Sequence, residues 1–154
     1  MSKIEQAQSY IRRVNNKLDE ARNQLQQKFN YAESVSASQE CIELSIKAIF
    51  LILGKDFPKK HEFKEEDFIK LLDKIPNELQ SYNFPRLYLL SKFWSNFYTV
   101  AKYGLEKLEV GADKLFTDKE ANLALKHAEE FYLASNALLQ NILMRNYKRP
   151  EAHD

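Results

Sequence analysis

Apolar residues recur at alternating three- and four-residue spacings near the start of the chain, and no other feature of the sequence constrains the fold as strongly. The series runs unbroken through Ile4, Ala7, Ile11, Val14, Leu18, Ala21 and Leu25. An α-helix completes one turn in about 3.6 residues, so these side chains share one helical face. The spacing predicts a long amphipathic helix that ends near residues 28–30, where Asn30 can cap or turn the chain.

Helical periods dominate the rest of the chain as well, and no segment of useful length alternates with a period of two. Three glycines and four prolines in 154 residues leave few turns. We expect a second helix over residues 31–53, a short helix over 65–75, and two further long helices over 83–108 and from 117 onward. Short connections place successive helices antiparallel. The sequence therefore predicts an all-α fold, an up-down antiparallel helical bundle of four long helices plus one short helix.

Local signals mark the ends of these helices. Gly54 stands where a helix-ending glycine is expected, and Asn83 is suited to cap the third long helix, with Pro85 tolerated in its first turn. Thr117 and Glu120 form the pattern of a capping box before the last helix. The length is that of one domain. We expect a single domain over residues 1–145 and a frayed tail over 146–154.

Charge and composition exclude several functional classes. The net charge of +1 lacks the basic excess of a dedicated nucleic-acid binder. A single cysteine, Cys41, excludes an internal disulfide and falls on an apolar face, as a buried small hydrophobe would. The longest apolar run, residues 48–53, is too short to span a bilayer, and the chain is charged from its start. We therefore expect a cytoplasmic protein that does not enter a membrane.

Metal and cofactor sites leave characteristic patterns that this sequence lacks. A di-iron site in a helical bundle needs Glu-x-x-His pairs, and none of His61, His127 and His153 has a glutamate three residues before it. No phosphate-binding glycine loop, cysteine cluster or nucleophile elbow is present either. We predict no metal, no cofactor and no catalytic residue.

A narrow polar strip interrupts the otherwise apolar second helix. Glu40, Glu43 and Lys47 share the one gap in a circumference that apolar side chains fill. The strip either faces water through a slot between neighbouring helices or lines a functional groove. If the Glu43–Lys47 pair is exposed, it contributes only about 0.3–0.5 kcal/mol. If the pair is at least half shielded, Lys47→Ala should cost about 3 kcal/mol or more.

Aromatic residues gather in the third long helix. Helical spacing assigns most of them to the core, whereas Tyr98, Lys102 and Tyr103 lie off the main apolar stripe and can reach a ligand or a partner chain. His61, in the segment "PKKH", is either a phosphate contact, a catalytic base or a solvated loop residue. His127 is expected to be solvated on the outer face of the last helix.

Four motifs, in order, resemble those of the HEPN family, small helical domains named for higher eukaryotes, prokaryotes and nucleotide binding. The second helix has the family's Gln, then Glu-Leu-x-x-Lys-Ala and a closing glycine, and the following loop has a Pro and a His. The aromatic helix ends in a Tyr…Ala-x-Tyr element, and the last helix opens with Phe-Thr…Glu-Ala. The residues that match in the first three motifs are Gln39, Glu43, Leu44, Lys47, Ala48 and Gly54, then Pro58 and His61, then Tyr98, Ala101 and Tyr103.

The resemblance, which covers roughly residues 4–143, implies a homodimer, and in many members a nucleotidyltransferase partner within a toxin–antitoxin pair. It also implies that the Glu43–Lys47 strip serves more than solubility. The ribonuclease branch of the family carries an Arg, four to six residues and a His near the third long helix. Here no histidine stands between Phe84 and Gly111, and the family's Arg-Tyr-Pro is replaced by Lys102-Tyr103-Gly104.

These observations favour a non-catalytic HEPN-like homodimer that binds a nucleotide or a partner protein such as a small nucleotidyltransferase. A metal-independent ribonuclease toxin and a purely structural bundle are the alternatives, and RNA is the other ligand to consider. The expected ligand-binding residues are Glu43, Lys47, His61, Tyr98, Lys102 and Tyr103.

Overall fold

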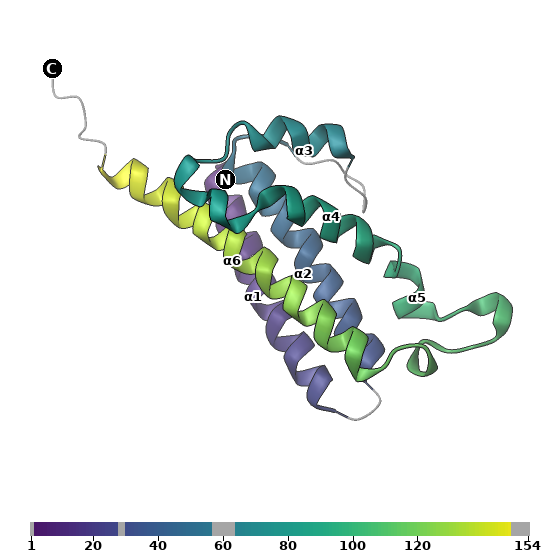
Figure 1. Cartoon of the computed structure of the whole chain (residues 1–154). Helices are drawn as coiled ribbons and strands as arrows, with labels where there is room; N and C mark the ends of the chain where they lie inside the picture. The colour runs from purple at the N-terminus through teal and green to yellow at the C-terminus, as the bar shows by residue number, and fades with distance from the viewer. Residues whose placement is uncertain (1, 28–29, 57–63, 149–154) are drawn as a thin grey trace, which may run out of the picture.

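The computed structural model describes residues 2–27, 30–56 and 64–148, and in these ranges the chain is built from helices (Figure 1). Three helices are long, namely α1 (Lys3–Gln26), α2 (Tyr31–Ile52) and α6 (Asp118–Lys148). In Figure 1, α1 runs opposite to α2, and α6 runs in the same direction as α2. The all-α bundle predicted from the helical periods is confirmed. No helix in the described ranges is long and apolar enough to cross a membrane.

The first helix forms as its pattern predicts. Ser2 caps α1 in a capping box, since its hydroxyl accepts from the Glu5 backbone N–H at 3.1 Å and the Glu5 carboxylate accepts from the Ser2 N–H at 3.0 Å. The apolar face is buried at Ala7, Ile11, Val14, Leu18 and Ala21. This face packs on α2, and α1 also contacts α6.

Helix α2 lies at the centre of the domain, in contact with α1, α4, α5 and α6. Two of its small polar residues are satisfied inside the core: the Ser34 hydroxyl donates to the Ala21 carbonyl at 2.8 Å, and the Ser45 hydroxyl donates to the Cys41 carbonyl at 2.8 Å. The buried Ser38 hydroxyl has no hydrogen-bond partner within the described chain. Cys41 is fully buried, and burial raises the pKa of its thiol to about 12. The prediction of a buried cysteine is thus confirmed.

The long helix predicted over residues 83–108 is instead divided. Helix α4 (Phe84–Ser95) is followed by the short α5 (Tyr98–Tyr103) and a 3₁₀ turn, η2 (Glu106–Leu108). The Ser95 hydroxyl and the Asn96 amide both donate to the Lys92 carbonyl, at 2.9 and 3.3 Å, and so occupy an acceptor that a continuing α-helix would use. Only three of the four long helices expected from the sequence therefore exist as single helices in the described chain.

The remaining elements pack around this frame. Helix α3 (Glu65–Leu72) lies against α4, and the 3₁₀ helix η1 (Asn77–Tyr82) contacts α6. Asn83 adopts a left-handed conformation with φ of 53° and caps α4, as predicted, by accepting from the Arg86 N–H at 3.3 Å. A 3₁₀ turn, η3 (Ala112–Lys114), leads from η2 toward α6.

The last helix begins at the predicted capping box. The Glu120 carboxylate accepts from the Thr117 N–H at 3.2 Å and from the Thr117 hydroxyl, and this side-chain hydrogen bond lowers the pKa of Glu120. Helix α6 continues to Lys148, so residues 146–148 of the predicted frayed tail are helical. The rest of that tail lies outside the described residues.

Candidate functional site

Two adjacent cavities lie over α2 and together form what we call the α2 groove. The larger has a volume of about 250 Å³ and the smaller about 170 Å³. Glu43 and Tyr98 line both cavities, so the two share a border. The larger cavity is lined by Gln39, Ile42, Glu43, Ile46, Ser91, Lys92, Trp94, Ser95, Asn96, Tyr98 and Thr99. The smaller is lined by Arg13, Glu40, Glu43, Leu44, Lys47, Tyr98 and Lys102.

The polar strip of α2 forms the floor of this groove. Lys47 Nζ lies 3.2 Å from Glu43 Oε1, and the two side chains are 22% and 19% exposed, respectively. The prediction that both are at least half shielded is confirmed. The strip therefore lies in a groove between neighbouring helices.

Removal of the lysine from this pair gives a direct test of its shielding. We expect Lys47→Ala to lower the free energy of unfolding by about 3 kcal/mol, at the low end for a buried pair, because the Glu43 carboxylate is left without its lysine while part of it still reaches water. Urea denaturation at neutral pH measures this change. Arg22→Ala is the control, since Arg22 and its partners Asp19 and Glu129 are 43%, 62% and 42% exposed, and each of these exposed pairs should contribute at most about 1 kcal/mol. A loss below about 0.5 kcal/mol for Lys47→Ala would contradict a shielded pair.

Helix α5 contributes the wall opposite the strip. Lys102 Nζ donates to the Tyr98 hydroxyl at 3.0 Å and lies 4.4 Å from the centre of the Tyr98 ring. This hydrogen bond raises the pKa of Lys102, so the side chain is a cation at neutral pH. The ammonium has three donors, so two remain for a further acceptor.

The six ligand-binding residues predicted from the sequence divide into three groups. Glu43, Lys47, Tyr98 and Lys102 are brought together in the α2 groove. Tyr103 follows Lys102 in α5 but is 62% exposed and lines neither cavity. His61 lies outside the described residues.

Gln39 and Trp94 shape the inner end of the larger cavity. The Gln39 amide nitrogen donates to the Trp94 backbone carbonyl, which fixes the orientation of the amide because a flipped amide would oppose two oxygens. The Gln39 carbonyl oxygen is buried and has no hydrogen-bond partner within the described chain. An unpaired buried acceptor beside a cavity is a costly arrangement that a ligand with a hydrogen-bond donor would relieve.

The predicted position of His127 is wrong. His127 is only 8% exposed, and its Nδ1 accepts a hydrogen bond from Trp94 Nε1 at 2.9 Å. Burial lowers the pKa of His127, because the charged imidazolium is poorly solvated there. The flanking Lys126 and Glu129 suggested an outer face, but Trp94 comes from α4, 33 residues away in the chain, and covers the ring. The histidine thus supports the wall of the groove.

Several groove residues were missed by sequence reasoning. Arg13 reaches the smaller cavity from α1. Glu40 was recognised as part of the polar strip, but its ion pair with Lys17 at 2.9 Å was not. That ion pair follows from the register of α1 against α2, which no local pattern reveals. Ser95 and Thr99, which line the larger cavity, are brought there by the break between α4 and α5. Within the described ranges, no group of three or more His, Cys, Asp or Glu side chains could hold a metal ion.

Comparison with known proteins gives one informative match. The family model described as HEPN domain matches residues 7–138, which is most of the chain and includes every described residue that lines the α2 groove. The resemblance drawn from the sequence motifs is thereby confirmed. No curated protein and no solved structure matches the chain.

Proposed function

Since this chain belongs to the HEPN family, a nucleotide-binding and ribonuclease-type family, we propose that it is a non-catalytic member that binds a nucleotide in the α2 groove. The observation that carries the proposal is the convergence of Glu43, Lys47, Tyr98 and Lys102 on one pair of cavities. Tyr98 offers an aromatic face for a base, and the lysines offer positive charge for phosphate. We propose further that the protein acts in the cytoplasm as a homodimer beside a partner such as a small nucleotidyltransferase, in a toxin–antitoxin-like system.

Nucleotide binding is tested by titration. Purified protein is mixed with each of the common ribonucleotides, and thermal unfolding is followed together with calorimetric binding. A ligand that binds only the native state at about one hundred times its dissociation constant stabilises that state by about 2.7 kcal/mol. We expect at least one nucleotide to raise the unfolding temperature in this way.

A cavity-filling variant tests whether the nucleotide binds in the α2 groove. Thr99 is exposed and lines the larger cavity, so Thr99→Trp should fill that cavity and abolish nucleotide binding without unfolding the protein. Gln140→Trp, at an exposed position of α6 outside both cavities, is the matched control and should bind as the wild type does. Equal binding by the wild type and Thr99→Trp would show that the nucleotide occupies another site.

Ribonuclease activity is not expected. Cleavage through a 2′-hydroxyl needs a proton-transferring group beside a cation, and imidazole suits this role. None of the described residues that line the groove is a histidine, and His127 is buried against Trp94. Single-stranded RNA and transfer RNA should therefore stay intact with the wild type. Cleavage that the double variant Lys102→Ala, His61→Ala loses would instead favour the ribonuclease alternative.

The proposed homodimer is supported by apolar side chains exposed on α4, and not by the apolar circumference of α2. The apolar circumference of α2 is covered within one chain, so it gives no argument for a partner. Leu89 and Phe93, 62% and 44% exposed, lie four residues apart on α4, and Ile69 on the adjacent α3 is 54% exposed (Figure 1). Exposed apolar groups on neighbouring helices are typical of an interface.

Sedimentation equilibrium tests this dimer. At tens of micromolar we expect a species of twice the 18.1 kDa chain mass. Leu89→Glu should shift the equilibrium to the monomer because it buries a charge in the interface. Leu133→Glu on α6, where the leucine is 57% exposed, is the matched control and should leave the dimer intact. Only an 18.1 kDa species for the wild type would contradict the homodimer.

A further inference from the structure

The smaller cavity of the α2 groove is lined by charged side chains from three helices. Arg13 comes from α1, Glu40, Glu43 and Lys47 come from α2, and Lys102 comes from α5. The cavity wall thus contains three cations and two carboxylates.

Both carboxylates already have a cationic partner. Lys47 pairs with Glu43 at 3.2 Å, and Glu40 pairs at 2.9 Å with Lys17, which lies outside the cavity lining. The hydrogen bond to Glu40 is the main reason that the pKa of Lys17 is raised. Arg13 and Lys102 are therefore the two cations of this wall that form no ion pair within the described chain, although the charge of nearby Glu40 also acts on Lys102.

The surroundings of these two cations leave them able to bind an anion. The Arg13 guanidinium lies 5.3 Å from the centre of the Tyr10 ring, an interaction that leaves its N–H donors available. Lys102 donates one hydrogen bond, to Tyr98, and keeps two further donors. An arginine fork with a neighbouring lysine is a favourable arrangement for phosphate, since the arginine binds two oxygens at once and the lysine adds a point charge.

We infer that the smaller cavity binds the terminal phosphate of a free nucleotide through Arg13 and Lys102, while the base lies in the larger cavity. This inference rests on the proposed nucleotide binding and adds the orientation and class of the ligand. A terminal phosphate with a charge of about −2 matches two unpaired cations better than a phosphodiester within RNA, which has a single charge. Glu43, which borders both cavities, then lies beside the ribose, and the ring of Tyr98, which also borders both, remains beside the base.

The volume and the polar lining of the larger cavity suit a single nucleobase. Its volume of about 250 Å³ lies just below the range of about 300–1,000 Å³ usual for ligand pockets. The lining includes the hydroxyl or amide groups of Ser91, Ser95 and Asn96. It also includes Gln39, whose carbonyl oxygen is buried and has no hydrogen-bond partner within the described chain. A base with amino and carbonyl groups on its edge can exchange hydrogen bonds with such a wall.

Calorimetry with matched ligands tests the phosphate position. The probes are the four common ribonucleosides, their 5′-monophosphates and a dinucleotide with one internal phosphodiester. We expect the best monophosphate to bind at least about tenfold more tightly than its nucleoside, since hydrogen bonds to charged groups are strong. The double variant Arg13→Gln, Lys102→Gln should remove this difference, so that the monophosphate binds no more tightly than its nucleoside.

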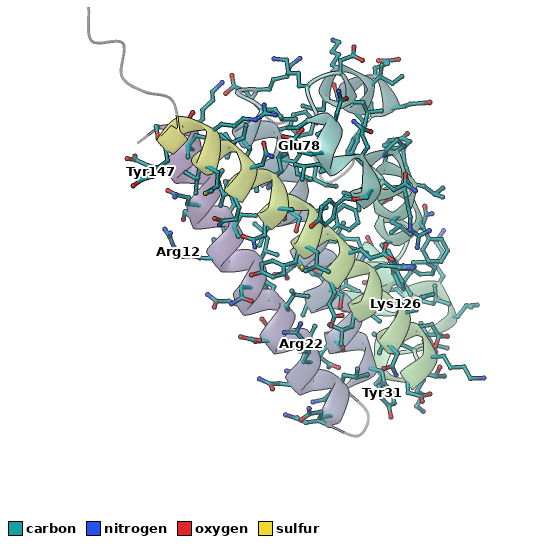
Figure 2. All side chains as sticks on the ribbon, turned by 60° about the vertical axis from the view of Figure 1, so that its left-hand side comes forward. Arg12, Arg22, Tyr31, Glu78, Lys126 and Tyr147 are labelled. Carbon is teal, nitrogen blue, oxygen red and sulfur yellow. The ribbon has the colours of Figure 1, made fainter. Side chains whose placement is uncertain are left out.

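A second double variant controls for net charge. Arg12→Gln, Lys126→Gln removes the same two charges from exposed positions outside both cavities, and Figure 2 shows that Arg12 points away from the bundle. It should bind the monophosphate as the wild type does. Circular dichroism verifies that both double variants are folded, as expected of substitutions at exposed positions.

The outcomes separate the inference from the function on which it rests. Equal affinity for nucleoside and monophosphate, or a monophosphate affinity that the Arg13 and Lys102 substitutions leave unchanged, would overturn the phosphate position while nucleotide binding stands. Tighter binding of the dinucleotide than of the monophosphate would overturn the inference that the cavity binds a terminal phosphate, and would favour RNA as the ligand. If folded wild-type protein binds no nucleoside and no nucleotide, both the inference and the proposed function are wrong.

Discussion

Replacement of Gly104 by alanine should lower the free energy of unfolding by about 3 kcal/mol or more, the sum of backbone strain and a steric clash. Gly104 has φ of 72° and ψ of −161°, a conformation that is nearly restricted to glycine. A Cβ atom there would lie 2.2 Å from the Val110 carbonyl oxygen and 2.8 Å from the Ala112 nitrogen. Because both neighbours are backbone atoms, the clash cannot be relieved by a side-chain rotation.

The clash acts on the segment that ends α5. The Leu105 N–H donates to the Val110 carbonyl at 2.9 Å, and the Val110 N–H donates to the Leu105 carbonyl at 3.2 Å. These two hydrogen bonds close the loop after Lys102 and Tyr103, so a shift of Val110 also displaces the α5 wall of the groove. We therefore expect Gly104→Ala to weaken nucleotide binding as well as stability.

Gly54→Ala is the matched control for Gly104→Ala. Gly54 also has a positive φ, of 78°, but a Cβ atom there meets no described atom within 4 Å. Gly54→Ala should lower the free energy of unfolding only by the cost of a left-handed backbone conformation, about 1–2 kcal/mol. Urea denaturation measures both variants under the same conditions. Equal losses for the two would mean that the loop after α5 opens freely and does not hold the groove wall.

Local helical periods were sufficient to predict most of the fold. The three- and four-residue spacing in α1 identified each residue that α1 buries, and the predicted capping box at Thr117 begins α6 in the structure. Such signals act within one or two turns of a helix, so the sequence displays them directly. The break after Ser95 was missed because an apolar stripe continued across it, while the competing hydrogen bonds to Lys92 depend on side-chain conformation.

The candidate site was only partly predictable, for a related reason. Glu43 and Lys47 could be identified because they form a polar strip on an otherwise apolar helix. Tyr98 and Lys102 could be identified because they lie off the apolar stripe of the expected third long helix. Arg13 gave no such signal, since its proximity to Lys102 depends on how α1 and α5 each pack on α2. His127 was misplaced because its burial depends on a tryptophan from another helix.

That tryptophan is the subject of the second large expected effect. Trp94→Ala should lower the free energy of unfolding by about 3–5 kcal/mol, because Trp94 is only 2% exposed and its removal leaves a cavity. Its ring also packs edge-on against Phe93 at 5.0 Å and near Phe97 at 5.6 Å. Since Trp94 lines the larger cavity, the variant should lose nucleotide binding at temperatures where it remains folded.

Trp94→Phe separates the contribution of the Trp94–His127 hydrogen bond from the contribution of the buried side-chain volume. Phenylalanine keeps an aromatic ring but no N–H, so the buried His127 Nδ1 loses its donor, at a cost of about 1–3 kcal/mol. The bond needs a neutral imidazole, and burial already places the pKa of folded His127 below its ordinary value of 6.5. As the pH falls below about 6.5, the unfolded chain takes up a proton that the folded chain resists, so the wild type loses stability.

The same linkage makes the effect of Trp94→Phe depend on pH. Once folded His127 is protonated, Nδ1 no longer accepts the tryptophan N–H. The wild type then loses the stabilisation from this hydrogen bond, which Trp94→Phe lacks at every pH. The difference in free energy of unfolding between wild type and Trp94→Phe should therefore be largest near neutral pH and shrink as the pH is lowered through the depressed pKa of folded His127, as urea denaturation across a pH series would measure. His127→Gln in both backgrounds is the control and should abolish the pH dependence of that difference. A difference that is constant with pH would mean that the two rings contribute through packing and that the hydrogen bond adds nothing measurable.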